Sequence, residues 1–341
     1  MTATIMRSPH ENVTVRASTR TLVVSAVLTS LVVVVGLLSI TITRDLPPST
    51  VASTLTGHGT RGSEFLVYGL RMPRLLCAVL VGLALGAGGA LFQSLLNNPL
   101  GSPDIVGFTE GASAGAVVAI TLFQGALPGT AVGAAVGALV TAAVIYALSS
   151  RRGTEGYRLV LVGIAVSLML QALVNYLLTR VGLGHAQLAQ VWLTGSLDGS
   201  GWPQVWPGLA AVLILLPLSA AATRRLALLE MGDEAARALG VNVARTRLGA
   251  LLLGVGLVTV AALTAGPIGF VALAAPQIAR RLTRSSGVGL LPAALTGALV
   301  LVLADWAAHY AFGAELPVGV ATGAVGGIYL AWLLSRKWRS A

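Results

Sequence analysis

Charged side chains are scarce in this sequence. Asp, Glu, Lys and Arg make up 10% of the 341 residues, whereas hydrophobic residues make up 55% and the mean hydropathy is +0.85. A soluble domain carries roughly a quarter charged residues, so the composition excludes an ordinary soluble protein. A helix that crosses the hydrocarbon core needs about 20 apolar residues. We therefore expect an all-α integral membrane protein of about ten transmembrane helices.

Three residue types that build catalytic or metal sites are nearly missing. The only lysine, Lys337, lies close to the C-terminus, so the chain cannot contain the lysine-bearing phosphate loop of an ATPase. The only cysteine, Cys77, sits in an apolar run, which excludes a disulfide framework and a thiolate metal site. The four histidines are scattered along the sequence and show no metal-binding spacing: His10, His58, His185 and His309. We expect no metal site, no cofactor and no catalytic residue in this chain.

Ionisable residues are also missing from the middles of the expected spans. Secondary transporters usually place such groups at mid-bilayer, where an unpaired charge costs about 2.5–3.5 kcal/mol. Here the acids closest to the spans lie near their expected ends: Asp104, Glu110, Asp305 and Glu315. Proton or sodium coupling therefore has no evident side-chain carrier, although backbone carbonyls can also bind sodium.

What the sequence does contain is a succession of long apolar runs. The expected spans are 21–43, 72–95, 106–123, 131–149, 159–179, 205–222, 248–265, 268–281, 290–308 and 316–334. If the N-terminus is cytoplasmic, 17 of the 22 basic residues fall on the cytoplasmic side, which is the positive-inside pattern. The net charge of +10 is thus a matter of topology and does not indicate nucleic-acid binding. We expect a multi-pass protein of a bacterial plasma membrane, with cytoplasmic tails at 1–20 and 336–341 around a membrane domain at 21–335.

One polar segment interrupts the apolar chain between the sixth and seventh spans. Residues 222–248 carry five arginines and three acids. Within them, Asp233 to Leu239 predicts a short helix, because acids occupy its first turn and Gly240 follows its end. The segment is either a solvated basic loop or a surface that the protein presents to a soluble partner.

Two further patterns have more than one interpretation. In the fifth span, polar side chains recur every fourth residue and form one stripe: Ser167, Gln171, Asn175 and Thr179. The stripe either bonds to another helix or lines an aqueous path. The segments 98–107 and 266–269 are rich in Pro and Gly, so neither continues a helix. They are either simple connections or corresponding breaks in an internal repeat.

Four stretches together resemble a known family. They are RMPRLLCAVLVGLALGAGGALFQSLLNNPLGSPDIVGFTEGASAGA (71–116), VWLTGSLDGSGW (191–202), GDEAARALGV (232–241), and a set that runs from GPIGFVALAAPQIARRL (266–282) through LADW (303–306) to ELPVGVATGAVGG (315–327). The residues of these motifs and their order along the chain are similar to those of the FecCD-type permease subunits of ABC importers for ferric siderophores, haem and cobalamin. The resemblance covers nearly the whole chain after about residue 20. It implies the type II ABC importer permease fold, with two internally related units.

The resemblance also implies partners. Family members work with an ABC ATPase dimer that binds ATP and Mg, a second permease chain, identical or homologous, and an extracytoplasmic substrate-binding protein. Arg71 and Arg74 match the arginines that dock the binding protein, although interfacial snorkelling is the ordinary interpretation of such arginines. His309 stands where the family usually has a third docking arginine, which puts that contact in doubt.

The remaining site residues are assigned through the same resemblance. The segment at about 223–247 corresponds to the part that couples the permease to the ATPase, and its motif residues are Gly232, Asp233, Glu234, Ala235, Leu239 and Gly240. The fifth helix of the family lines the path at the dimer axis, which favours the aqueous interpretation of the stripe.

The motifs do not name the cargo. An iron chelate such as a ferric siderophore is the leading hypothesis, and cobalamin or haem import by the same fold is the alternative. An ion-coupled secondary transporter is a third hypothesis, against which the missing intramembrane charges and the coupling segment both count. No nucleophile–base pair suggests a membrane enzyme.

Overall fold

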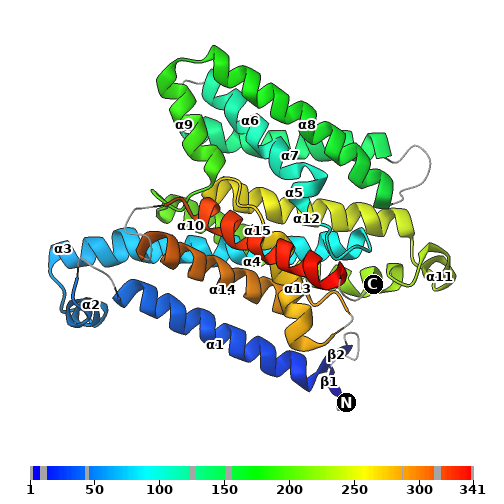
Figure 1. Ribbon diagram of the computed structural model, residues 1–341. Helices are drawn as coiled ribbons and strands as arrows, with labels where there is room; N and C mark the ends of the chain where they lie inside the picture. The colour runs from blue at the N-terminus through cyan, green and yellow to red at the C-terminus, as the bar shows by residue number, and fades with distance from the viewer. Residues whose placement is uncertain are drawn as a thin grey trace.

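The computed structural model describes residues 3–7, 14–42, 46–122, 127–149, 156–285, 287–310 and 316–338. A short antiparallel hairpin of β1 (Ala3–Arg7) and β2 (Thr14–Ser18) pairs Ala3 with Ser18. Helices make up nearly everything else (Figure 1). They are α1 (Thr19–Thr41), α2 (Pro48–Leu55), α3 (Arg61–Glu64), the π-helix η1 (Phe65–Arg71), α4 (Met72–Leu95), α5 (Pro103–Val106), α6 (Phe108–Leu122), α7 (Leu127–Ser149), α8 (Gly156–Arg180), α9 (Leu183–Thr194), α10 (Trp202–Leu229), α11 (Asp233–Ala238), α12 (Val243–Ala265), α13 (Val271–Thr283), α14 (Leu290–Tyr310) and α15 (Val318–Trp338).

The ten expected spans correspond to ten of these helices. Within the described residues, seven helices are long and apolar enough to cross a membrane. Two shorter apolar helical stretches are α6, at Phe108–Leu122, and the part of α15 at Val318–Tyr329. The span expected at 268–281 corresponds to α13, which begins three residues later and has 13 residues against the 14 expected. At 1.5 Å per residue it covers about 20 Å, less than the ~30 Å of the hydrocarbon core.

The N-terminal segment also differs from the expectation. Within the tail expected at 1–20, residues 3–7 and 14–18 pair as strands, and α1 begins at Thr19. Alternating polar and β-branched residues, as in Thr14 and Val15, are compatible with a strand. Runs of five residues are too short for this alternation to predict a strand from the sequence.

Helix α4 lies at the centre of the molecule. Most of its residues are buried, and α10, α12, α13 and α14 pack around it (Figure 1). Glycine makes the close contact with α14 possible. A Cβ atom on Gly82 would lie 2.5 Å from the carbonyl oxygen of Gly297, and one on Gly86 would lie 2.2 Å from that of Ala293. These distances are shorter than any real Cβ contact, so the two helices meet backbone to backbone.

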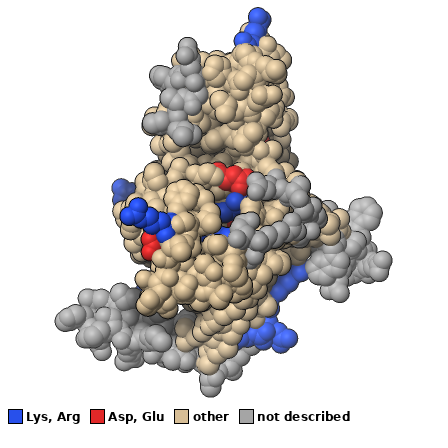
Figure 2. Space-filling view, turned by 90° about the vertical axis from the view of Figure 1, so that its left-hand side faces the viewer, with Lys and Arg blue, Asp and Glu red and all other residues tan. Residues whose placement is uncertain are grey.

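A second group of helices, α6 to α9, covers one side of this centre (Figure 1). Helices α6 and α7 also pack through glycines, because a Cβ on Gly115 would lie 2.0 Å from the carbonyl oxygen of Gly133. The outer faces of α1, α7, α8 and α10 expose many large apolar side chains. The face seen in Figure 2 is accordingly mostly uncharged. This surface is suited to lipid or to another apolar chain, which confirms the all-α membrane fold.

Candidate functional site

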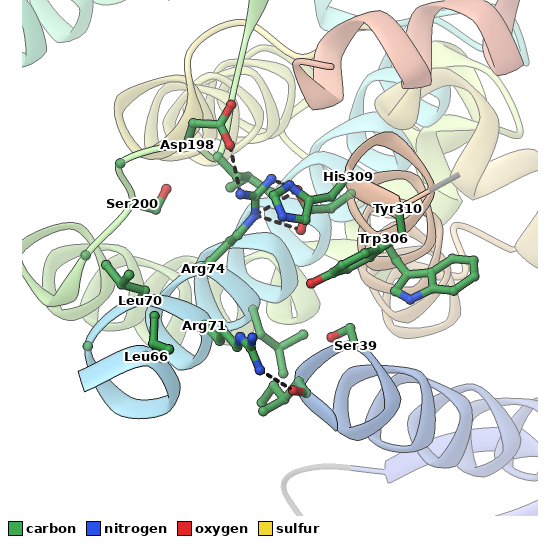
Figure 3. Close-up of a pocket in the computed structure, with 17 residues that line it drawn as sticks. Ser39, Leu66, Leu70, Arg71, Arg74, Asp198, Ser200, Trp306, His309 and Tyr310 are labelled. Carbon is green, nitrogen blue, oxygen red and sulfur yellow. Dashed lines mark hydrogen bonds and ion pairs between the residues drawn. The ribbon is translucent and has the colours of Figure 1, made fainter. Parts of the chain in front are cut away.

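A pocket of about 420 Å³ opens at the end of the molecule where α4 begins. It lies between the end of α1, the η1–α4 junction, the segment 197–201 and the end of α14. Figure 2 shows basic and acidic side chains next to each other around a hollow on this face. Arg71, Arg74 and His309, the three residues that the resemblance assigns to docking, all line this pocket (Figure 3).

Arg74 forms ion pairs with two aspartates in the pocket. Its guanidinium donates to both carboxylate oxygens of Asp305 in α14, with Nη2–Oδ1 at 2.9 Å and Nε–Oδ2 at 3.1 Å. Its Nη1 lies 2.8 Å from Oδ1 of Asp198. The Arg74 side chain is 22% exposed, and the side chains of Asp305 and Asp198 are 15% and 46% exposed. Arg74 is therefore held on its buried side by Asp305 and on its open side by Asp198.

The other two residues that the resemblance assigns to docking also contact neighbouring parts of the chain. Arg71 donates from Nη1 to the backbone carbonyl of Ile40 at 3.2 Å, next to the end of α1 (Figure 3). The His309 ring meets the ring of Tyr310 edge-on, with 4.7 Å between ring centroids. Its Nδ1 is buried and makes no hydrogen bond with the residues that the structure describes.

Sequence reasoning missed the two aspartates as partners of Arg74. Both lie in motifs that carried the family resemblance, SLDGSG and LADW, but neither was given a role. Asp305 is 231 positions away from Arg74. No local spacing rule brings such residues together, so only the packing of α4 on α14 could reveal the pair.

The polar stripe of α8 divides into two parts. Ser167 is partly buried and donates to the carbonyl oxygen of Gly163 at 2.8 Å, within its own helix. Gln171, Asn175 and Thr179 are exposed, and Thr179 donates to the carbonyl oxygen of Tyr176 at 2.7 Å. Only these last three stripe residues are left uncovered by the described parts of this chain. Amides facing lipid would lack partners, which leaves water or a second chain as their neighbour.

The short helix predicted at 233–239 is present and projects from the body of the molecule as α11 (Figure 1). Gly232 and Gly240 flank it with φ of +105° and +78°, a backbone conformation that favours glycine. Asp233 is bonded to Arg247 of α12 at 2.8 Å and so anchors α11. Glu234 is exposed, and Leu239 is 60% exposed at the end of the helix.

The projection also includes a residue that the motif did not single out. Met231 is 67% exposed just before Gly232. Of the other motif residues, Ala235 is partly buried. Met231 and Leu239 therefore place two large exposed apolar side chains on this projection.

The two helix-breaking segments meet inside the molecule. The partly buried carboxylate of Asp104 in α5 accepts a hydrogen bond from Thr109 Oγ1 at 2.6 Å and another from the backbone N–H of Phe270. Gln277 Nε2 donates to the carbonyl oxygen of Pro99 at 2.9 Å. Both segments are therefore parts of one junction rather than independent surface loops.

Among the residues that the structure describes, no three His, Cys, Asp or Glu side chains gather as metal ligands. The arrangement combines spanning helices with an ion-paired pocket at one end and a projecting polar helix at the other (Figure 1). These features define a multi-pass membrane protein with distinct polar features at its two ends.

Comparison with known proteins identifies the family. Residues 28–336 match the FecCD transport family, and the chain belongs to it. It is 43% identical to the ferric enterobactin transport system permease protein FepG of Escherichia coli, over 86% of this chain and 89% of that protein. It is 35% identical to the vitamin B12 import system permease protein BtuC of Salmonella typhi, over 81% of this chain and 85% of that one.

A solved structure agrees with this assignment. A metal-chelate type ABC transporter in an inward-facing conformation superimposes with a TM-score of 0.81 and 27% identity, over 92% of this chain and 99% of that one. The family resemblance and the type II permease fold predicted from the sequence are thereby confirmed.

Proposed function

We propose that this chain is the membrane-spanning permease subunit of an ABC importer that carries a ferric siderophore or a related iron chelate into the cytoplasm. The observation that carries the proposal is the 43% identity with a ferric enterobactin permease over most of both chains. The match to the vitamin B12 permease, at 35%, supports cobalamin as the second candidate cargo.

Two copies of the chain, or this chain and a homologue, would enclose one path at their interface. The exposed amides of Gln171 and Asn175 support a place for α8 beside that path, because they lack a protein neighbour in the described single chain. Neutral amides and hydroxyls would let a bulky chelate pass without holding it tightly. In this arrangement the permease performs no covalent chemistry and needs no cofactor of its own.

The two ends of the molecule would bind different partners. An extracytoplasmic binding protein would dock at the pocket that Arg71, Arg74 and His309 line. ABC ATPase subunits, which bind ATP and Mg, would receive α11 and its exposed Leu239 and Met231. The positive-inside distribution supports this orientation, with both termini and the projection in the cytoplasm.

The test is uptake of radiolabelled ferric chelates and of labelled cobalamin by cells with and without the gene. Cells without the gene should lose uptake of one class of ferric chelate, and the wild-type gene should restore that uptake. If cells without the gene lose only the uptake of cobalamin or haem, that compound replaces the iron chelate as the proposed cargo. Unchanged uptake of every chelate in a strain freed of other importers would refute the proposal.

Docking is tested at Arg71, because this residue lines the pocket and its replacement leaves the Arg74–Asp305 pair in place. Arg71→Glu should abolish uptake while the complex still assembles, since a carboxylate would then meet a carboxylate. Arg61→Glu is the matched control, because Arg61 is an exposed arginine near the same end and does not line the pocket. Equal uptake by the two variants would remove the docking role.

A further inference from the structure

The pocket does not offer a free positive charge to an incoming carboxylate. Among its lining residues, the charges of Arg71 and Arg74 are matched by those of Asp198 and Asp305. A carboxylate added to this balanced set would meet two others. Binding of an acidic side chain at Arg74 therefore requires that one aspartate leave.

The two aspartates differ in how firmly they are held. Asp305 is 15% exposed and accepts from both Nε and Nη2 of Arg74. Asp198 is 46% exposed and lies on Nη1 alone, at the open side of the pocket (Figure 3). A half-exposed ion pair is weak and exchanges with solvent-borne groups, whereas a buried bidentate pair does not. Asp198 is the one that can be displaced.

The segment that carries Asp198 is bonded to two other elements. Ser196 donates its backbone N–H to the carbonyl oxygen of Ala265, the last residue of α12, at 2.8 Å. Gly319, in the first turn of α15, donates to the carbonyl oxygen of Gly195 at 3.0 Å. The Ser196 hydroxyl also donates to Asp198 Oδ2 at 2.8 Å. Asp198 therefore lies two residues after Ser196, where the segment is bonded to α12, and three after Gly195, where it is bonded to α15.

We propose that the pocket is a carboxylate-exchange site in which Asp198 occupies the place of an acidic side chain from the docking protein. An incoming glutamate or aspartate displaces Asp198 from Nη1 of Arg74, while Asp305 keeps the guanidinium in position. The released 195–198 segment then loosens its bonds to Ala265 and Gly319. This inference rests on the proposed function, because it assumes a binding protein at this end.

The first test removes the charge of Asp198 without changing its shape. The probe is the binding protein that supports ferric-chelate uptake in the assay above, with the assembled transporter in lipid nanodiscs. Asp198→Asn should tighten docking by about two- to five-fold, the range expected for a half-exposed ion pair. The matched control is Glu64→Gln, which removes an exposed negative charge from the same end without contacting Arg74. Equal or weaker docking by Asp198→Asn than by this control overturns the exchange.

The second test needs no variant. Hydrogen–deuterium exchange of the wild-type complex is measured on peptides that contain Ser196 and Gly319, with and without a saturating amount of the binding protein. Exchange at both amides should rise on docking, because their hydrogen bonds depend on the 195–198 segment. Unchanged or slower exchange at saturation overturns the release. Arg71→Glu distinguishes a failure of the carboxylate exchange from a failure of the docking assignment. If that variant still docks normally, the proposed docking surface itself is wrong.

Discussion

The ion pair between Arg74 and Asp305 should couple α4 and α14 energetically. Losing one partner of a fully buried pair costs about 3–5 kcal/mol, and an exposed pair contributes about 0–1 kcal/mol. At 22% and 15% exposure this pair lies between those limits, and Asp198 still neutralises part of the charge on Arg74. We expect Asp305→Asn to lower the free energy of unfolding by about 2 kcal/mol, a roughly thirty-fold change in the equilibrium constant.

A double-mutant cycle measures that coupling. Arg74→Met keeps the apolar stem of the side chain, and the combined variant should cost about 1–2 kcal/mol less than the sum of the single variants. Unfolding is followed by tryptophan fluorescence during an SDS titration in mixed micelles. Arg61→Met with Glu64→Gln is the control pair at the same end, both residues being exposed. Fully additive costs for Arg74 and Asp305 would refute the reasoning.

Two further predictions concern the other end and the centre of the molecule. Leu239→Asp should reduce co-purification of the ATPase at least ten-fold and leave the SDS midpoint unchanged, because Leu239 is exposed on α11; a normal yield of complex would contradict the coupling assignment. Gly86→Ala should destabilise the chain by about 1–3 kcal/mol, since its Cβ would need about 1 Å more room against Ala293. Gly249→Ala, in open space on α12, should be neutral or slightly stabilising in the same titration, and equal effects of the two glycine variants would argue against backbone-to-backbone packing.

Local patterns predicted the helices well where one signal dominated. The span expected at 72–95 coincides with α4, and the helix expected at 233–239 corresponds to α11 at Asp233–Ala238. Apolar runs and capping signals act over one or two turns and can be read directly. Helix α9 was missed because its sequence, LGHAQLAQVWLT, mixes polar and apolar residues and begins beside glycines. Helix α13 begins at Val271 rather than at residue 268, because the helix-breaking segment extends through Phe270, whose φ is +67°.

The candidate site was predictable only in part, because its residues come from distant elements. Arg71, Arg74 and His309 were singled out by motif, and the fold brings them to one pocket. The partners of Arg74 could not be found in the same way, since an ion pair across 231 positions depends on how α4 packs against α14. Asp198 raises the same difficulty, because the hydrogen bonds that hold its segment come from α12 and α15.

Helix α4 physically joins the two proposed partner surfaces. Arg74 stands near its first turn in the pocket, and Ser94 near its end donates a hydrogen bond to Glu230, three residues before α11. The 20 positions that separate them correspond to about 30 Å of helix. Because Gly82 and Gly86 bring α4 into backbone contact with α14, α4 cannot slide without α14. Any movement that links docking at the pocket to the coupling helix should therefore carry α4 and α14 as one body and take up the change at the junctions of α12, α13 and α15.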